Sequence, residues 1–231
     1  MAKKQRVTIS LQTLFTLSPD KAVKYLESMG YKITWNWREQ LKAIQQHAFT
    51  VAKVTKADVL IAIKDALVKA LDAGMTYNDW KKQIDVVLQQ KGYQQRDDGS
   101  AWRKDTIFRT NLQSAYQAGR YEEMKNAKSA PYWQYVAVMD VRTRPSHAEL
   151  NGKVFRADDP FWKTHYPPNG YNCRCRVRAL TEEQVQSMGL RVSSGSDFKN
   201  INPDPGFETN PADWWQPDLR NYPKELRGEL K

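Results

Sequence analysis

Residues 132–180 decide the fold, and they read YWQYVAVMDVRTRPSHAELNGKVFRADDPFWKTHYPPNGYNCRCRVRAL. The first eight, Tyr132–Met139, are rich in aromatic and β-branched residues and predict a buried strand. The last eight, Cys173–Leu180, predict a second strand. The residues between them show no sustained period and contain Pro145, Gly152, Pro160, Pro167, Pro168 and Gly170. A long irregular stretch inside a compact domain is usually functional or is held by local cross-links.

Helices are predicted upstream of these strands. A long helix over Trp102–Lys128 carries small residues suited to close packing, and Pro131 marks its end. A short helix over Thr181–Gly189 follows the second strand. Four further helices, each with apolar residues at helical spacing, are predicted over Ser18–Gly30, Asn36–Ala48, Lys56–Ala73 and Thr76–Gly92. The fold class is therefore predicted to be α+β, with a helical N-terminal half preceding a small irregular β-containing core.

The chain divides into three predicted segments. The polar run QQRDDGS, residues 94–100, is a candidate boundary, because polar and glycine residues between periodic segments are typical of loops. We therefore expect a helical region over residues 1–98 and a core over residues 99–189. Residues 190–231 contain five prolines and the pair Trp214-Trp215, and they predict an extended arm that packs aromatic residues onto a surface.

Composition excludes several protein classes. The 231 residues include 26 aromatic side chains, which is too many for a disordered chain. No run of about 18 apolar residues occurs, so we expect no membrane span, and the N-terminus lacks the pattern of a signal peptide. Only two cysteines are present, separated by one residue, which argues against a secreted disulfide scaffold and favours a reducing cytoplasm.

Positive charge is concentrated in the middle of the chain. The formal net charge is +10. Residues 101–178 hold 14 basic and 7 acidic side chains, whereas residues 179–231 hold 6 and 9. This distribution favours a partner rich in phosphate or carboxylate, and it is also compatible with an ordinary solvated surface.

A zinc site is one interpretation of the irregular segment. Cys173 and Cys175 would share one face of a strand, and His147 and His165 would complete a tetrahedral Cys2His2 set. Asp140 is an alternative to His165 as the fourth ligand. The single residue between the cysteines is shorter than the usual spacing of structural zinc pairs. The alternative is that the cysteines are packing residues beside a hydrogen-bonded His147.

Two further interpretations involve the arginines of this segment. Cys173, with arginines on either side of Cys175, would be a nucleophile if His147 acted as its base. The arginines at alternate positions would form a strand face opposite the cysteines and bind phosphate, or they would pair with carboxylates inside the protein. We expect internal pairing for Arg142 at least. The proposed phosphate-binding residues are Arg174, Arg176 and Arg178.

Several rare motifs carry a family resemblance. The runs DVRTRPSHAELNGKVF, DPFW and YPPNGYNCRCRV resemble the core of the phage Mu F-like head morphogenesis proteins, also called minor head proteins. The upstream RTNLQSAYQAGRYEEM and YWQYVAVMD resemble the helix and strand that precede that core. LSPDKAVKYLESMGYKITWNW, HAFTVAK and NPDPGFETNPADWW are also similar to family members, so the resemblance covers nearly the whole chain. The positions that match the signature are Asp140, Arg142, Thr143, His147, Asn151, Gly152, Pro167, Pro168, Gly170, Cys173, Arg174 and Cys175.

The resemblance implies a role in head assembly of a tailed phage or prophage. Its implied partners are the portal protein, other head or scaffold proteins and non-specific double-stranded DNA, with no membrane. The implied location is the virion, in the head interior or at the portal vertex, with assembly in the host cytoplasm. No established catalytic activity accompanies the family core. Some relatives carry additional C-terminal domains, and we expect none here because the chain stops about 50 residues after the core.

Two other function classes remain open at this stage. A nuclease-like toxin would need a convergent histidine and carboxylate, for which His147 and Asp140 are the candidates. An ADP-ribosyl transferase would need an arginine on a strand, a Ser-Thr-Ser run and a Glu-x-Glu pair, and the last two are absent. A general DNA-binding module would show affinity that falls steeply with salt.

Overall fold

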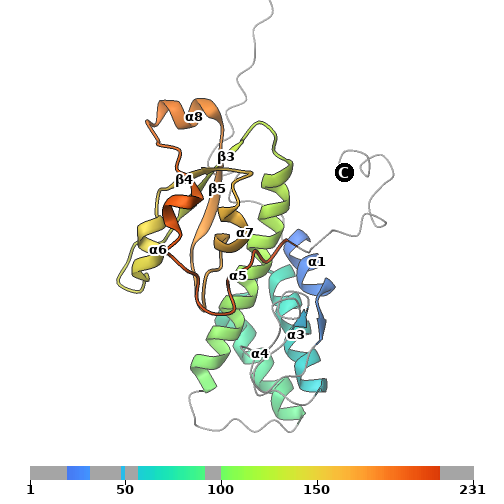
Figure 1. The fold of residues 1–231 in the computed structure, drawn as a ribbon. Coiled ribbons are helices and arrows are strands. Elements are labelled where there is room, and N and C mark those ends of the chain that lie inside the picture. Colours follow the sequence, from blue (N-terminus) through green and yellow to red (C-terminus); the bar gives the residue numbers. More distant parts are fainter. Residues whose placement is uncertain (1–19, 32–47, 50–56, 92–99, 214–231) are drawn as a thin grey trace, which may run out of the picture.

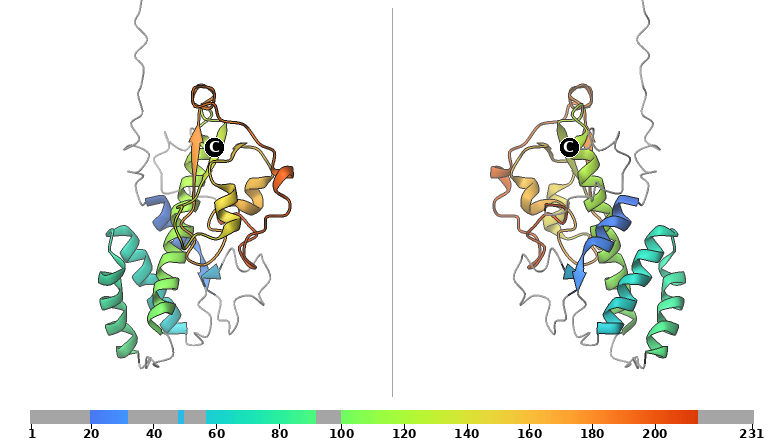
Figure 2. Two further views of the ribbon diagram at one scale, coloured as in Figure 1. Left: turned by 90° about the vertical axis from the view of Figure 1, so that its left-hand side faces the viewer. Right: turned by 90° about the vertical axis from the view of Figure 1, so that its right-hand side faces the viewer.

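One long helix separates a helical part from a small sheet (Figure 1). The computed structural model describes residues 20–31, 48–49, 57–91 and 100–213. The long helix, α5 (Ser100–Asn126), packs against the other helices along part of its length and against the sheet further on. The two views of Figure 2 show the N-terminal helices on one side of α5 and the sheet part on the other. The α+β class is confirmed.

The helical part forms because apolar stripes on its helices meet. On α4, residues Trp80, Ile84 and Leu88 recur every four positions and are buried. The hydroxyl of Thr76 accepts a hydrogen bond from the Asp79 backbone N–H, so Thr76 caps this helix as predicted. The helices of this part are α1 (Asp20–Ser28), α3 (Ala57–Asp72), α4 (Tyr77–Gln90) and the first half of α5.

Small residues let α1 and α5 approach closely. Ala115 and Ala118 are fully buried, and a Cβ on Gly119 would lie 3.1 Å from the backbone nitrogen of Ala22. These residues were predicted to be contact positions of the long helix, and the structure confirms that they are.

One helix prediction is wrong at its end. Ala48, assigned by sequence to the end of a helix, lies in the two-residue strand β2 (Ala48–Phe49). This strand pairs in parallel with β1 (Gly30–Tyr31), so its backbone is extended rather than helical. The rest of that predicted helix lies outside the described residues.

The sheet has three antiparallel strands in the order β4-β3-β5. The central strand, β3 (Tyr132–Val136), pairs with β4 (Val154–Arg156) and with β5 (Arg176–Leu180). Both predicted strands exist, but the first ends at Val136 rather than Met139. The second begins at Arg176, so the two cysteines precede the strand instead of lying on it.

The segment expected to be irregular contains three short elements. Helix α6 (Pro145–Leu150) starts with proline at its first position, where a missing N–H costs nothing. Strand β4 and helix α7 (Phe161–His165) follow. These elements persist because tertiary packing buries them, since each is too short to show a period of its own.

Aromatic rings fill the core between the sheet, α5 and α7. Trp133 and Tyr135 point inward from β3, and the ring of Phe155 stacks on Phe161 at 4.1 Å. Trp162 and Tyr166 complete the cluster and are almost fully buried. Each such ring pair adds about 0.5–1.5 kcal/mol beyond its buried area.

The chain after β5 packs back onto both parts. The predicted short helix is present as α8 (Glu182–Ser187), and Thr181 and Gln184 form a capping box at its start. A single 3-10 turn, η2 (Gly195–Phe198), follows. Residues 201–213, here called the C-terminal strap, then cross the sheet part and bring Ala212 into the core of the helical part. The described part of the predicted arm thus contacts its own chain, whereas Trp214 and Trp215 lie outside the described residues.

None of the helices in the described ranges is both long and apolar enough to cross a membrane.

Candidate functional site

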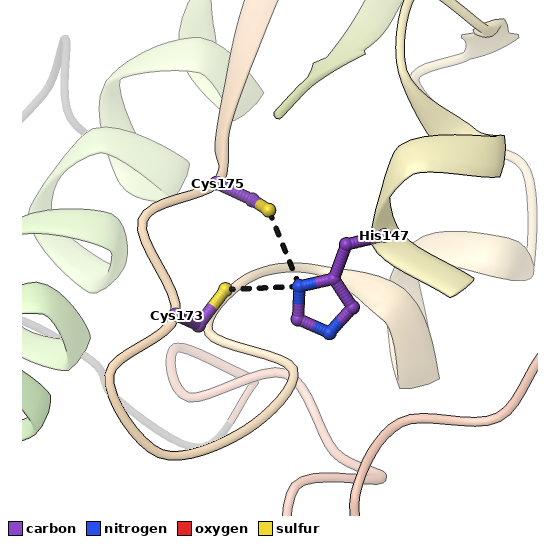
Figure 3. A group of neighbouring side chains, drawn as sticks. All are labelled: His147, Cys173 and Cys175. Carbon is purple, nitrogen blue, oxygen red and sulfur yellow. Dashed lines mark hydrogen bonds between the residues drawn. The ribbon is translucent and has the colours of Figure 1, made fainter. Parts of the chain in front are cut away.

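Two cysteines and a histidine converge beneath the sheet (Figure 3). His147 comes from α6, and Cys173 and Cys175 come from the turn that precedes β5. The Nδ1 atom of His147 lies 3.4 Å from the Cys175 sulfur and 3.8 Å from the Cys173 sulfur. The three donor atoms all lie within 4.8 Å of one another, and each residue is at most 5% exposed.

A turn anchored to α5 positions the cysteines. Asn172 adopts a left-handed backbone conformation, φ 56°, which asparagine tolerates better than most residues. Its backbone N–H donates to the Thr110 hydroxyl, and its side-chain amide donates to the Thr106 hydroxyl. The turn closes where the Cys173 N–H donates to the Gly170 carbonyl. Both sulfurs are thereby directed toward α6.

A second layer of hydrogen bonds surrounds the sulfurs. The Asn169 backbone N–H donates to the Cys173 sulfur, and the Tyr135 hydroxyl contacts the Cys175 sulfur. The Asn169 side-chain amide also donates to the Tyr135 hydroxyl at 3.1 Å. Sequence reasoning did not identify Asn169 or Tyr135 as site residues, because nothing in a turn or a buried strand marks such a contact.

The two thiols shift each other's pKa in opposite directions. A hydrogen bond from Cys175 holds the pKa of Cys173 well below that of an ordinary thiol, and His147 acts in the same direction. The same interaction, together with burial, raises the pKa of Cys175. Because both sulfurs are buried, this thiolate is poorly placed to attack a substrate, and a nucleophilic role gains no support from the geometry.

His165, the fourth ligand of the predicted Cys2His2 set, lies elsewhere. Its Nε2 atom is 2.6 Å from the Ile201 carbonyl oxygen, and its Nδ1 atom is 2.7 Å from the Thr164 hydroxyl. Its ring stacks on Phe161 with centroids 4.4 Å apart. The structure therefore brings together three of the four residues proposed for zinc, and His165 is not part of the group.

Asp140 is paired with Arg174 at the surface. Two guanidinium nitrogens of Arg174 donate to the two carboxylate oxygens of Asp140, each at 2.6 Å. Asp140 also accepts from the Arg142 backbone N–H, and Thr143 closes the same turn. Hydrogen bonds from Arg174 and then from Arg142 hold the pKa of Asp140 well below its usual value.

Two expectations about these polar residues are corrected. Internal ion pairing was expected for the Arg142 side chain, but within the described residues it forms no ion pair, and Arg174 takes the carboxylate instead. Asp140, the alternative metal ligand, has both oxygens occupied by Arg174 and is not in the group with His147.

The other signature positions shape the backbone around the site. The Asn151 side chain accepts from the Ala137 N–H, and Gly152, at φ 80°, links the turn after α6 to β3. Pro167 and Pro168 are joined by a cis peptide bond. A Cβ on Gly170 would lie 2.3 Å from a carboxylate oxygen of Asp204.

The three arginines proposed for phosphate binding divide between two environments. Arg174 lies before the strand and is paired with Asp140, so it does not share a β5 face with the others. Arg176 and Arg178 are alternate residues of β5 and are half-buried. Arg178 donates to the Gln134 side chain on β3, and burial followed by the charge of Arg176 lowers its pKa.

Side chains of α5 cover the outer edge of β5. The Gln113 amide donates to the Cys175 carbonyl at 2.7 Å, and the Arg120 Nε donates to the Val177 carbonyl at 2.8 Å. These bonds satisfy edge carbonyls that would otherwise be free to pair with another strand.

Comparisons with known proteins identify related sequences. Residues 62–178 match the profile of the family described as Phage Mu protein F like protein. Over 207 residues the chain is 46% identical to the "Putative capsid assembly protein F" of Escherichia phage Mu, which covers 84% of this chain and 47% of that protein. It is 49% identical over 172 residues to the "Mu-like prophage FluMu F protein" of Haemophilus influenzae, covering 70% of this chain and 42% of that protein.

No solved structure matches the chain. The chain spans about half the length of these two curated relatives. The matched residues run from α3 to β5 and include all three donors of the buried group. On this similarity, the chain belongs to the phage Mu protein F-like family.

Proposed function

We propose that this chain is a minor head protein of a tailed phage or prophage and acts in head morphogenesis. The observation that carries the proposal is the 46% identity, over 84% of the chain, to a protein named for capsid assembly. In this proposal the chain lies at the portal vertex and contacts packaged DNA, and it resides in the virion after assembly in the host cytoplasm.

The surroundings of the signature residues support a structural role. The oxygens of Asp140 are engaged by Arg174, and His147 faces two buried sulfurs. The pair proposed for a nuclease, His147 with Asp140, therefore does not converge on a common substrate position. These contacts stabilise turns, which is consistent with a structural role.

Contacts with other head proteins must use residues outside the apolar stripes of the helices. Those stripes face each other within the helical part and are used up in its core. Ile61 on α3 and Val86 on α4 remain 43% and 54% exposed. We propose that the portal or another head protein is contacted through such exposed positions on α3 and α4.

Particles purified from the host that carries the gene test the proposal. Quantitative mass spectrometry is expected to find this chain at a few copies per head. Its absence from particles that contain the other head proteins would contradict a virion location.

Co-purification tests the contact with the portal. A tagged chain should retain the portal protein from lysates of assembling cells, and an Ile61→Ser/Val86→Ser variant should retain less. The exposed residue Met188 on the opposite part provides a matched control, since Met188→Ser removes similar apolar area away from α3 and α4. Equal retention by both variants would contradict docking through these helices.

A further inference from the structure

We propose that His147, Cys173 and Cys175 bind one Zn²⁺ ion, with a water molecule as the fourth ligand, and that this ion fastens α6 to the start of β5. The proposal goes beyond the role in head assembly and does not depend on it. It rests on the convergence of the three donors from two separate segments of the chain.

The distances fit a tetrahedral ion. Zinc binds sulfur at about 2.3 Å and imidazole nitrogen at about 2.0–2.1 Å, so a tetrahedral angle places sulfur and nitrogen about 3.6 Å apart. The observed separations from His147 Nδ1 are 3.4 Å to Cys175 and 3.8 Å to Cys173. Both observed separations are therefore close to that of a nitrogen and a sulfur ligand of one zinc ion.

Hydrogen bonds to the His147 ring do not by themselves account for the approach of both sulfurs. In the tautomer that carries its proton on Nε2, Nδ1 has one lone pair and accepts one hydrogen bond, and in the other tautomer it donates one. Here two sulfurs approach the same nitrogen, so at most one thiol is satisfied by it (Figure 3). A cation at the centre of the triangle interacts with both sulfurs and the nitrogen together.

The outer contacts are those that thiolate ligands need. The Asn169 backbone N–H donates to the Cys173 sulfur, and the Tyr135 hydroxyl contacts the Cys175 sulfur. Such donors orient metal ligands and stabilise negative sulfur. Two thiolates and an imidazole form a soft donor set, which favours zinc over magnesium or calcium.

The position of the site gives the ion a structural task. His147 lies 26 residues before Cys173 in the chain, and the two are separated by β4 and α7. The sheet strands of this part have only three to five residues. A bound ion would therefore stabilise a segment whose helices and strands are too short to hold it together by themselves.

Metal analysis of the purified full-length chain tests the site. Inductively coupled plasma mass spectrometry is expected to find about one zinc per chain. A Cys173→Ser/Cys175→Ser variant should fall at least tenfold in zinc content. A His165→Gln variant is the matched control, because this histidine also lies in the sheet part but outside the cluster, and it should retain zinc.

A measurement on the unaltered chain covers the case in which the cysteine variant does not fold. After removal of metal with a chelator, cobalt(II) should give thiolate-to-metal absorption and strong tetrahedral visible bands that saturate at one equivalent. Zinc should displace the cobalt and raise the melting temperature. A folded chain without zinc, without cobalt–thiolate absorption and without a zinc-dependent shift in melting temperature would overturn the proposal. Zinc retained by the folded double variant would overturn it as well.

Discussion

Gly170 leaves no room for a side chain where the C-terminal strap meets the core. A Cβ there would approach Asp204, whose carboxylate is paired with Arg144 at 2.9 Å. Replacing Gly170 with alanine should displace that carboxylate and destabilise the fold by about 1–3 kcal/mol, the usual cost of overpacking. Urea denaturation followed by tryptophan fluorescence measures the change.

A second background for this experiment removes the side chain of Asp204, which the new Cβ would meet. In an Asp204→Ala background the same glycine replacement should cost clearly less than in the unaltered chain, because the nearest atoms are gone. Equal costs in the two backgrounds would show that the close approach to Asp204 is not what restricts Gly170.

The ion pair of Asp140 predicts a pH dependence. Arg174 and the Arg142 N–H hold the pKa of Asp140 below its value in the unfolded chain, about 3.9. The stabilisation is therefore fully present above about pH 5 and is lost as the pH falls through the unfolded pKa toward the lower folded pKa. The stability difference between the unaltered chain and Asp140→Asn should shrink between about pH 5 and about pH 2 in thermal unfolding.

Arg174→Gln provides the control for this pH effect. Without the guanidinium, the Asp140→Asn exchange should show little of the same pH dependence. A difference between unaltered chain and Asp140→Asn that stays constant down to about pH 2 would contradict the assigned pairing.

At the level of single residues, the sequence predicted some of the side chains that lie together, but not the direction of the others. The grouping of His147 with both cysteines was predicted from residue type alone. His165 has the same chemistry, but its direction depends on its stack with Phe161, which no spacing rule indicates. The pair Asp140–Arg174 joins positions 34 residues apart, so it becomes visible only when the turns are placed.

Among the elements, α5 protects the edge of the sheet. The Gln113 amide donates to the Cys175 carbonyl, which lies at the start of β5. A Gln113→Leu replacement leaves this partly buried carbonyl unpaired and should cost about 1–3 kcal/mol. Differential scanning calorimetry measures the loss as a lower melting temperature.

Tyr116 on the same helix supplies a comparison. It is exposed, so Tyr116→Leu should change stability by less than about 0.5 kcal/mol. If both leucine variants melt alike, the carbonyl contact of Gln113 contributes nothing measurable.

Length and local signals such as helix caps together determine which elements the sequence reveals, since the six-residue α8 was predicted from its start at Thr181. Helices α3, α4 and α5 have 14 to 27 residues, and their apolar periods predicted them within a few positions. Helix α6 has six residues, α7 has five and β4 has three, so none completes a recognisable pattern. Their conformations depend on the aromatic core that buries them, and that core exists only after distant segments meet.

On the scale of the whole molecule, net charge is the property most relevant to DNA. A chain of charge +10 should bind double-stranded DNA without sequence preference. Its affinity for the DNA should fall as the salt concentration rises. Arg176 and Arg178 lie on one face of β5. Replacing both with glutamine should reduce the slope of log affinity against log salt by about 1 to 2, because Arg178 is half-buried and bonded to Gln134. Fluorescence anisotropy with a labelled duplex at several salt concentrations measures this slope.

A second double variant removes the same charge from a different surface. Arg191 and Lys199 are both exposed and lie beyond α8, so Arg191→Gln/Lys199→Gln should leave the slope almost unchanged. Equal losses in the two variants would assign the binding to overall charge rather than to the face of β5.

The division of the chain into three segments stays a prediction. The overall class followed from composition and period, because helices precede strands along the chain. Sequence alone did not indicate that α5 contributes to two cores, with Ala115 and Ala118 in one and Met124 in the other. Small and apolar residues on a helix indicate that it is buried, but they do not indicate which elements pack against it.

The C-terminal strap also determines when the two cores can be completed during synthesis. Phe207 packs against the ring of Tyr171, the Asn210 side chain donates to the Trp162 carbonyl, and Ala212 enters the core of the helical part. All three are translated after every helix and strand that they contact. A nascent chain still missing residues 201–213 therefore exposes apolar surface on both parts, and neither core is complete until this segment has left the ribosome.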